Sequence, residues 1–270
     1  MYPIAARFGD LTIATHDLFS VLGVLVGFAI YYRELRQRGW LEPWIVLVSL
    51  AALIGAVVGA RLATAWERPD WWLPFTVLPL TQALEVSGKS IIGAIAGGYL
   101  AIVTAKRALG YRRSTGDAYV LAIPVATMIG RIGCFLSELP LGTPTSLPWG
   151  VSVDAATAAQ FTDCPGCTMP MHPTMLYEIA FNALAVLAIL RWRDRVPASG
   201  DALKLYLIAA ATFRFGVEYL RTSPRLALDL TAPQWVLIPM IALLAVHFVR
   251  QARRGAWRVP LAPRPLEAAT

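Results

Sequence analysis

Long apolar stretches separated by short polar segments dominate the chain. A helix needs about 20 mainly apolar residues to cross the hydrocarbon core of a bilayer, which is roughly 30 Å thick. The sequence divides into seven stretches of this kind. They cover approximately residues 13–32, 44–66, 90–105, 118–137, 174–192, 202–220 and 234–250. The pattern predicts an all-α integral membrane protein with seven transmembrane helices in a single membrane domain, residues 1–270.

The third stretch is short and rich in glycine, with Gly93, Gly97 and Gly98. Small residues allow the backbones of two membrane helices to approach closely. We therefore expect this helix to pack against a neighbouring helix rather than against lipid.

Composition agrees with the hydropathy pattern. Hydrophobic residues make up 57% of the chain and charged residues 15%, with a mean hydropathy of +0.56. An ordinary soluble domain has about 45–50% apolar and about 25% charged residues. The formal net charge is +7, but the basic residues fall in short runs between apolar stretches rather than together on one face. This distribution argues against a nucleic-acid partner and favours contact with membrane lipids.

The basic runs also predict the orientation, because cytoplasmic loops of membrane proteins are enriched in Lys and Arg. Runs follow every second predicted span, whereas residues 139–174 contain no Lys or Arg. The N-terminus is therefore predicted to be periplasmic and the C-terminus cytoplasmic. The runs are Arg33, Arg36 and Arg38; Lys106, Arg107, Arg112 and Arg113; Arg191, Arg193 and Arg195; and Arg250, Arg253, Arg254 and Arg258.

Two external segments have their own character. Residues 139–173 are rich in Pro, Gly, Thr and Ser and are predicted to form a small periplasmic head, in which Leu147 to Val153 alternate like a short strand. Residues 66–89 contain Trp71, Trp72 and several prolines, a composition typical of a segment at the membrane interface. Met1 to Asp10 lack an apolar core, so no cleavable signal peptide is predicted.

Several charged residues lie at the outer ends of predicted spans, where charge is costly and usually functional. They are Arg61, Arg131, Glu178, Arg214 and Glu218. Converging arginines suit a phosphate-bearing lipid head group, because guanidinium groups bind phosphate oxygens in a bidentate manner.

Each of these charges also has a simpler explanation. Arg61 and Arg131 could reach the surface along their aliphatic stems. Arg214 and Glu218 are four residues apart on one helix face and could form an internal ion pair. Glu178 could stabilise the dipole of its helix.

The cysteines and one histidine are further candidates. Cys164-Pro-Gly-Cys167 lies in the external head, where a disulfide is favoured, and Cys134 is predicted to pack as a small apolar residue. His16, followed by Asp17, could act as a base near neutral pH, or this stretch could simply cap a helix. No spacing in the chain indicates a metal site or an organic cofactor.

Motifs in this sequence resemble those of the prolipoprotein diacylglyceryl transferase family, in the same order, from about residue 13 to 250. They are Gly59-Ala-Arg-Leu62, the stretch from Gly130-Arg-Ile-Gly-Cys-Phe-Leu136 to Gly142, His172-Pro-Thr-Met-Leu-Tyr-Glu178, Phe213-Arg-Phe-Gly-Val-Glu-Tyr-Leu-Arg221, and Leu230-Thr-Ala-Pro-Gln-Trp235 with Pro239-Met240.

The resemblance implies a seven-helix enzyme of the bacterial inner membrane with its site toward the periplasm. Such an enzyme transfers the diacylglyceryl group of phosphatidylglycerol to the lipobox cysteine of a prolipoprotein signal peptide and releases glycerol 1-phosphate. The implied catalytic residues are Arg131, Arg214, Glu218 and Glu178, to which His16 is added as a candidate base from its own chemistry. The implied substrate-binding residues are Arg61, Arg131, Gly142, His172, Tyr177 and Arg221.

The chain departs from the family pattern at four positions. Cys134 stands where Asn is common, and Glu138 lies one position early. Ile92 stands where the best-known members carry a His that has been proposed as the base, and His16 replaces a Tyr. His16 or Glu178 is therefore the candidate base. A related transferase with another acceptor and a non-catalytic lipid-binding protein remain alternatives.

Overall fold

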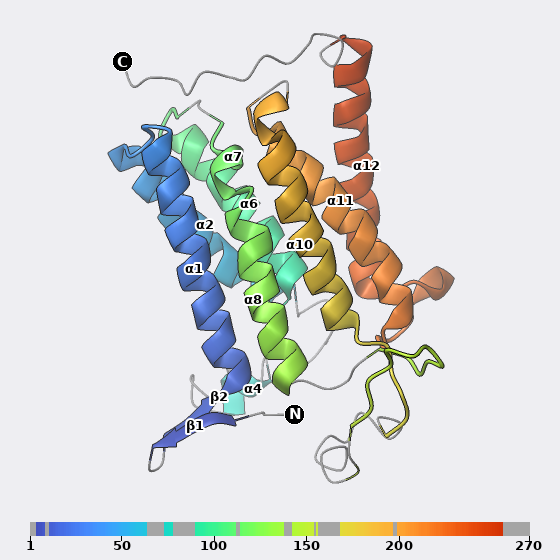
Figure 1. Cartoon of the computed structure of the whole chain (residues 1–270). Helices are drawn as coiled ribbons and strands as arrows, with labels where there is room; N and C mark the ends of the chain where they lie inside the picture. The colour runs from blue at the N-terminus through green and yellow to red at the C-terminus, as the bar shows by residue number, and fades with distance from the viewer. Residues whose placement is uncertain are drawn as a thin grey trace. The chain divides into compact units, whose positions relative to one another are not determined.

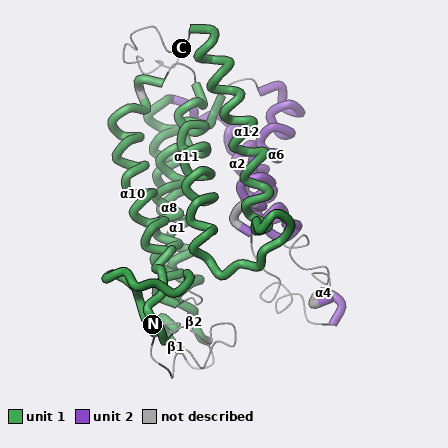
Figure 2. Tube along the Cα trace, turned by 90° about the vertical axis from the view of Figure 1, so that its right-hand side faces the viewer, with its two compact units in different colours: residues 1–38, 114–268, 270 green, residues 39–113, 269 purple. Residues whose placement is uncertain are grey.

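The computed structural model describes residues 4–8, 11–63, 73–77, 90–111, 114–137, 142–153, 155, 168–196 and 199–255. These residues are mostly helical. Leaving aside the last two residues, the chain divides into two compact units, which are coloured separately in Figure 2. Unit 1 comprises residues 1–38 and 114–268, and unit 2 comprises residues 39–113.

Unit 1 contains most of the helices. α8 (Ala122–Ser137) lies between α1 (Thr15–Gln37) and α10 (Thr174–Trp192), and α11 (Asp201–Val217) packs against α10 and α12 (Ala232–Arg253) (Figure 1). Its shorter elements are β1 (Ile4–Phe8), β2 (Leu11–Ala14), α7 (Gly116–Tyr119), η1 (Arg193–Arg195), η2 (Glu218–Leu220) and η3 (Ala227–Asp229).

Small residues bring α1 and α8 together. A Cβ added at Gly23 would lie 2.8 Å from the Ala126 carbonyl oxygen, and one at Gly133 would lie 2.5 Å from Phe19 Cβ. Val120 and Tyr206 belong to a buried apolar cluster, against which Phe181 and Ala185 of α10 also pack. These contacts hold the three helices that carry the candidate site.

Unit 2 is built around the pair α2 (Pro43–Leu62) and α6 (Ile91–Ala108), with the short α4 (Pro74–Val77). A Cβ on Gly97 would lie 2.8 Å from Gly59 Cα, so the two backbones touch where these glycines meet. Gly55 and Gly93 lie one turn away in the same contact, a small-residue spacing typical of paired membrane helices. The predicted role of the glycine-rich third stretch in helix packing is confirmed.

Five of the helical segments are long and apolar enough to cross a membrane. They are Thr15–Gln37, Pro43–Leu62, Gly116–Ser137, Thr174–Trp192 and Ala232–Arg253. Exposed leucines such as Leu184 on α10 and Leu243 on α12 fit an environment of lipid rather than water. The other two predicted spans coincide with α6 and α11, which have 18 and 17 residues. The chain is therefore a multi-pass membrane protein.

The mostly helical structure agrees with the predicted all-α class, and the one sheet among the described residues is the antiparallel hairpin of β1 and β2 that precedes α1. One prediction about local structure is wrong. Leu147 to Val153 is not a strand. The Gly150 N–H donates to the Leu147 carbonyl at 2.9 Å in a turn, and Val151 alone pairs with Met171. Pro148 has no N–H with which to extend a ladder.

Some predictions fall outside the described residues. These include the proposed disulfide of Cys164 and Cys167, the acidic residue Glu138, and most of the interfacial segment 66–89.

Candidate active site

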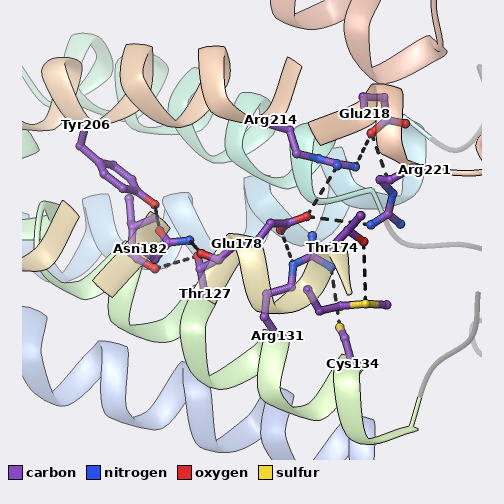
Figure 3. Close-up of polar contacts among 12 residues, drawn as sticks. Thr127, Arg131, Cys134, Thr174, Glu178, Asn182, Tyr206, Arg214, Glu218 and Arg221 are labelled. Atoms are coloured by element: carbon purple, nitrogen blue, oxygen red, sulfur yellow. Dashed lines mark hydrogen bonds and ion pairs between the residues drawn. The ribbon is translucent and has the colours of Figure 1, made fainter. Parts of the chain in front are cut away.

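Charged side chains from α8, α10 and the end of α11 meet inside unit 1 (Figure 3). We call these five residues the arginine cluster. They are Arg131 on α8, Glu178 on α10, Arg214 on α11, Glu218 at the start of η2, and Arg221 directly after η2. Four of the five were predicted as catalytic residues, and Arg131 and Arg221 were predicted to bind substrate. The structure brings all five together.

Glu178 is the centre of the arginine cluster. Its carboxylate oxygens lie 2.5 Å from Arg131 Nε, 3.6 Å from Arg214 Nη1 and 3.9 Å from Arg221 Nη1. Its side chain is only 6% exposed. A carboxylate at this depth is tolerable because cations surround it.

Glu218 holds the two arginines at the end of α11. Its carboxylate lies 2.8 Å from Arg214 Nη2 and 3.9 Å from Arg221 Nε, and its side chain is fully buried. The spacing of four residues explains the first contact, because residues i and i+4 share a helix face. The expected ion pair is therefore present, although Arg214 also contacts Glu178.

Arg131 does not reach to the surface, so the explanation by its aliphatic stem is wrong. Its guanidinium group turns inward to Glu178, and its side chain is 12% exposed. Its Nη1 also lies 3.8 Å from the Cys134 sulfur. Cys134 itself packs with Met171 and Met175 in a buried apolar cluster, as expected for a small apolar residue.

The ion pairs leave hydrogen-bonding capacity unused. Buried guanidinium nitrogens of all three arginines and buried oxygens of both carboxylates make no aligned hydrogen bond, although they lie in contact with opposite charges. The three arginines and two carboxylates of this cluster give a net charge of +1. The cluster therefore carries an excess positive charge equal in size to the charge of one monoanion.

The head segment fixes the position of Arg221. Gly142 pairs with Arg221 as an antiparallel bridge, and its N–H donates to the His172 carbonyl at 2.7 Å. A Cβ at Gly142 would collide with the Leu220 carbonyl oxygen and would lie 2.8 Å from His172 Cβ. Only glycine fits between the segments that contain Leu220 and His172, which explains a glycine at this predicted substrate-binding position.

A second polar group lies near the start of α10. Trp149 Nε1 donates to the Tyr177 hydroxyl at 2.8 Å, and His172 Nδ1 lies 3.1 Å from the same hydroxyl. His172 and Tyr177 were predicted, but Trp149 was not. An aromatic residue in a Pro- and Gly-rich external loop was the available signal.

A buried polar contact supports Glu178 from one helical turn away. Asn182 Nδ2 donates to the Glu178 carbonyl at 2.7 Å, and the Tyr206 hydroxyl donates to Asn182 Oδ1 at 2.8 Å (Figure 3). The bond from α11 to α10 braces the two helices whose charges meet in the cluster. Neither Asn182 nor Tyr206 was predicted from the sequence.

Two predicted site residues, His16 and Arg61, are not among the five residues of the arginine cluster. The His16 ring lies 3.3 Å from Asp17, and the His16 carbonyl lies against Gly133, which faces away from Arg131 on α8. Arg61 is in the last turn of α2, in unit 2. Among the described residues, no three His, Cys, Asp or Glu side chains are grouped to hold a metal ion.

Comparisons with known proteins identify the family of the chain. The family model described as prolipoprotein diacylglyceryl transferase matches residues 3–250. A phosphatidylglycerol–prolipoprotein diacylglyceryl transferase of Cupriavidus metallidurans is 29% identical over 94% of this chain and 94% of its own length. Proteins of the same name from Leifsonia xyli and Clostridium tetani are 32% and 27% identical, over 90% and 83% of this chain and 75% and 87% of their own lengths. The chain therefore belongs to the prolipoprotein diacylglyceryl transferase family.

Proposed function

We propose that the arginine cluster is the site at which this chain performs the reaction of its family. That reaction is the transfer of the diacylglyceryl group from phosphatidylglycerol to a prolipoprotein, a step of lipoprotein biosynthesis. The acceptor is the thiol of the lipobox cysteine in the signal peptide. The net charge of +1 where three partly buried arginines converge on two buried carboxylates is the observation that carries the proposal.

Arg131, Arg214 and Arg221 bind the phosphate of the donor lipid. A phosphodiester has one negative charge, which neutralises the excess charge of the cluster. Its oxygens accept hydrogen bonds from the guanidinium N–H groups that have no aligned partner in the protein. Gly142 allows the head segment to pack closely against Arg221, which holds this arginine in position to bind the phosphate.

The chemical step exchanges one bond for another. The cysteine sulfur bonds to the glyceryl carbon that bears the phosphate, the carbon–oxygen bond breaks, and its electron pair leaves on the oxygen of glycerol 1-phosphate. The thiol loses its proton, because the thiolate is the nucleophile. Negative charge grows on the leaving phosphate, and the arginines of the cluster stabilise it there.

Glu178 and Glu218 hold the arginines in place. The Glu178 carboxylate contacts three guanidinium groups, so its oxygens are engaged in positioning them rather than in taking the thiol proton. His16 is left as the candidate base from the sequence. The group formed by His172, Tyr177 and Trp149 lies beside the same end of α10 and suits contact with the acceptor peptide.

The membrane arrangement completes the proposal. We infer seven spans in the bacterial inner membrane, with α6 and α11 as the two shorter ones. The arginine cluster then lies toward the periplasm, because the basic runs at the opposite helix ends are cytoplasmic.

The test measures glycerol phosphate release by purified protein in micelles that contain phosphatidylglycerol and a lipobox peptide. The test variant is Arg131→Ala. The matched control is Arg36→Ala, which replaces an exposed arginine in the last turn of α1. We expect release to require the cysteine of the peptide, to fall about 10²–10³-fold in Arg131→Ala, and to be unchanged in Arg36→Ala.

Equal release by Arg131→Ala and wild type would remove the arginine cluster from the mechanism. No release by wild type, under conditions where the Cupriavidus metallidurans relative is active, would instead point to a different acceptor or to lipid binding without catalysis.

A further inference from the structure

The segment that joins α11 to α12, residues 222–231, exposes apolar side chains. Leu228 is 81% exposed and Leu226 is 48% exposed. Leu228 is the most exposed large apolar side chain in the part of the chain that the structure describes. Unlike exposed leucines on α10 and α12, it does not lie on a membrane-spanning helix.

The backbone at the tip of this segment is strained. Leu228 has φ 57° and ψ 28°, and Asp229 has φ 55°. The left-handed region is unfavourable for residues that have a Cβ, and leucine has no polar atom with which to compensate. Strain of this kind persists where the surrounding structure holds it and is often tied to function.

Hydrogen bonds close the segment on itself. The Leu226 N–H donates to the Leu230 carbonyl at 2.7 Å, and the Leu230 N–H donates to the Ala227 carbonyl at 3.3 Å. Arg225 Nη1 donates to the Asp229 carbonyl at 3.1 Å. Irregular backbone does not lie exposed in the hydrocarbon core. A loop of this kind therefore reaches lipid at the interface, where its backbone stays at head-group level and its apolar side chains enter the acyl region.

The surroundings indicate lipid as the partner. Figure 1 shows the segment projecting to the side of the helices of unit 1, above the level at which α1 begins and α8 ends. Tyr219 and Trp235 flank it, and Trp235 Nε1 donates to the Ala227 carbonyl at 3.3 Å. Tyr and Trp concentrate where acyl chains meet head groups. Val236 and Ile238 continue the exposed apolar surface along α12.

We propose that residues 222–231 form a lipid-embedded loop, with Leu226 and Leu228 among the acyl chains of the leaflet that adjoins the arginine cluster. Arg225, which lies 5.3 Å from the Tyr219 ring centroid, then lies at the level of the lipid phosphates. The strain at Leu228 keeps its side chain directed away from the protein. The loop fixes the depth of Arg221, four residues before Arg225, in the membrane.

The test measures the environment of position 228 by spin labelling. The full chain carries Leu228→Cys, with Cys134, Cys164 and Cys167 replaced by alanine, in vesicles of phosphatidylglycerol and phosphatidylcholine. Two control labels replace Leu243, exposed on α12, and Trp149, exposed in the head. We expect the accessibility ratio of oxygen to a water-soluble nickel chelate at 228 to match that at 243 and to exceed that at 149 several-fold.

A ratio at 228 equal to that at 149 would overturn the proposal, as would a ratio that rises only when a lipobox peptide is added. The second outcome would make the loop a peptide-binding surface. A photoreactive benzophenone amino acid at position 228, in a chain that keeps all its cysteines, provides an independent measurement. We expect lipid adducts at 228 and not at 149, and adducts with the peptide alone would refute the lipid-embedded loop. Neither readout depends on catalysis, so the result is separate from the test of the transferase reaction.

Discussion

Glu178→Gln removes the central charge of the arginine cluster and keeps the size of the side chain. Three guanidinium groups would then face the single carboxylate of Glu218, and the net charge of the cluster would rise from +1 to +2. The glutamine amide could accept hydrogen bonds from one arginine but could not neutralise the others. The substitution therefore separates the electrostatic role of Glu178 from its packing.

The contacts of Glu178 set the expected magnitude. Its oxygens lie 2.5, 3.6 and 3.9 Å from nitrogens of three arginines. One pair of unit charges at 4 Å is worth about 4 kcal/mol at an effective dielectric constant near 20, most of which is offset by the cost of burying the charges. Removing one partner leaves the others uncompensated and typically costs about 3–5 kcal/mol. We expect that decrease in the free energy of unfolding.

Unfolding by SDS titration in mixed micelles measures this change. Asp17→Asn is the control, because Asp17 is 64% exposed and its contact with His16 is an exposed one, worth about 0–1 kcal/mol. We also expect turnover of Glu178→Gln to fall about 10²-fold, because arginines displaced by about 1 Å no longer stabilise the leaving phosphate. Binding of phosphatidylglycerol should not weaken, since the cluster is more positive.

A free energy of unfolding for Glu178→Gln within about 1 kcal/mol of wild type would refute the reasoning, because loss of a buried charge with three partners should destabilise the protein by more than this. Retained turnover with lost stability would mean that Glu178 supports the fold but does not position the arginines.

Three further changes test other contacts. Gly142→Ala should abolish turnover and lower the free energy of unfolding by about 1–3 kcal/mol, because the new Cβ would meet atoms within 3 Å. Gly216→Ala is the control, because there is open space around Gly216, and it should change the free energy of unfolding by less than about 1 kcal/mol and turnover by less than about twofold. Gly97→Ile should lower the thermal unfolding temperature by separating α2 from α6, with Gly98→Ala as the milder control. Asp201→Asn should lower unfolding stability by about 1–3 kcal/mol with unchanged turnover, because its buried hydrogen bonds to Lys204 and His247 lie at the other end of α11.

Hydropathy predicted the long helices because each presents apolar side chains to lipid around most of its circumference. It did not predict the β1–β2 hairpin. Leu11 and Ile13 are apolar like the residues of α1, and nothing in a hydropathy pattern separates them from the span that follows. The alternation with Thr12 was the usable signal, but it extends over four residues only.

Spacing within one helix predicted the contact between Arg214 and Glu218, since four residues make one turn. Spacing could not predict that Arg131 turns toward Glu178, because the two residues lie on different helices and their contact depends on how α8 packs against α10. Asn182 was within reach of the same rule, four residues after Glu178 on α10. A pattern of charges does not single out Asn182, because its amide is uncharged.

The composition of the arginine cluster bears on which lipid it accepts. Three arginines without carboxylates would repel one another and would open the site when no lipid is bound. Two carboxylates make the empty cluster stable and leave a charge of +1, which one phosphodiester neutralises. A zwitterionic lipid would bring an ammonium group beside guanidinium groups that already lack full compensation, at a further electrostatic cost. The uncharged glycerol head of phosphatidylglycerol adds no such cation. In the mechanism that we propose, charge balance in the cluster therefore selects an anionic phospholipid as donor, before any contact with its head group is made.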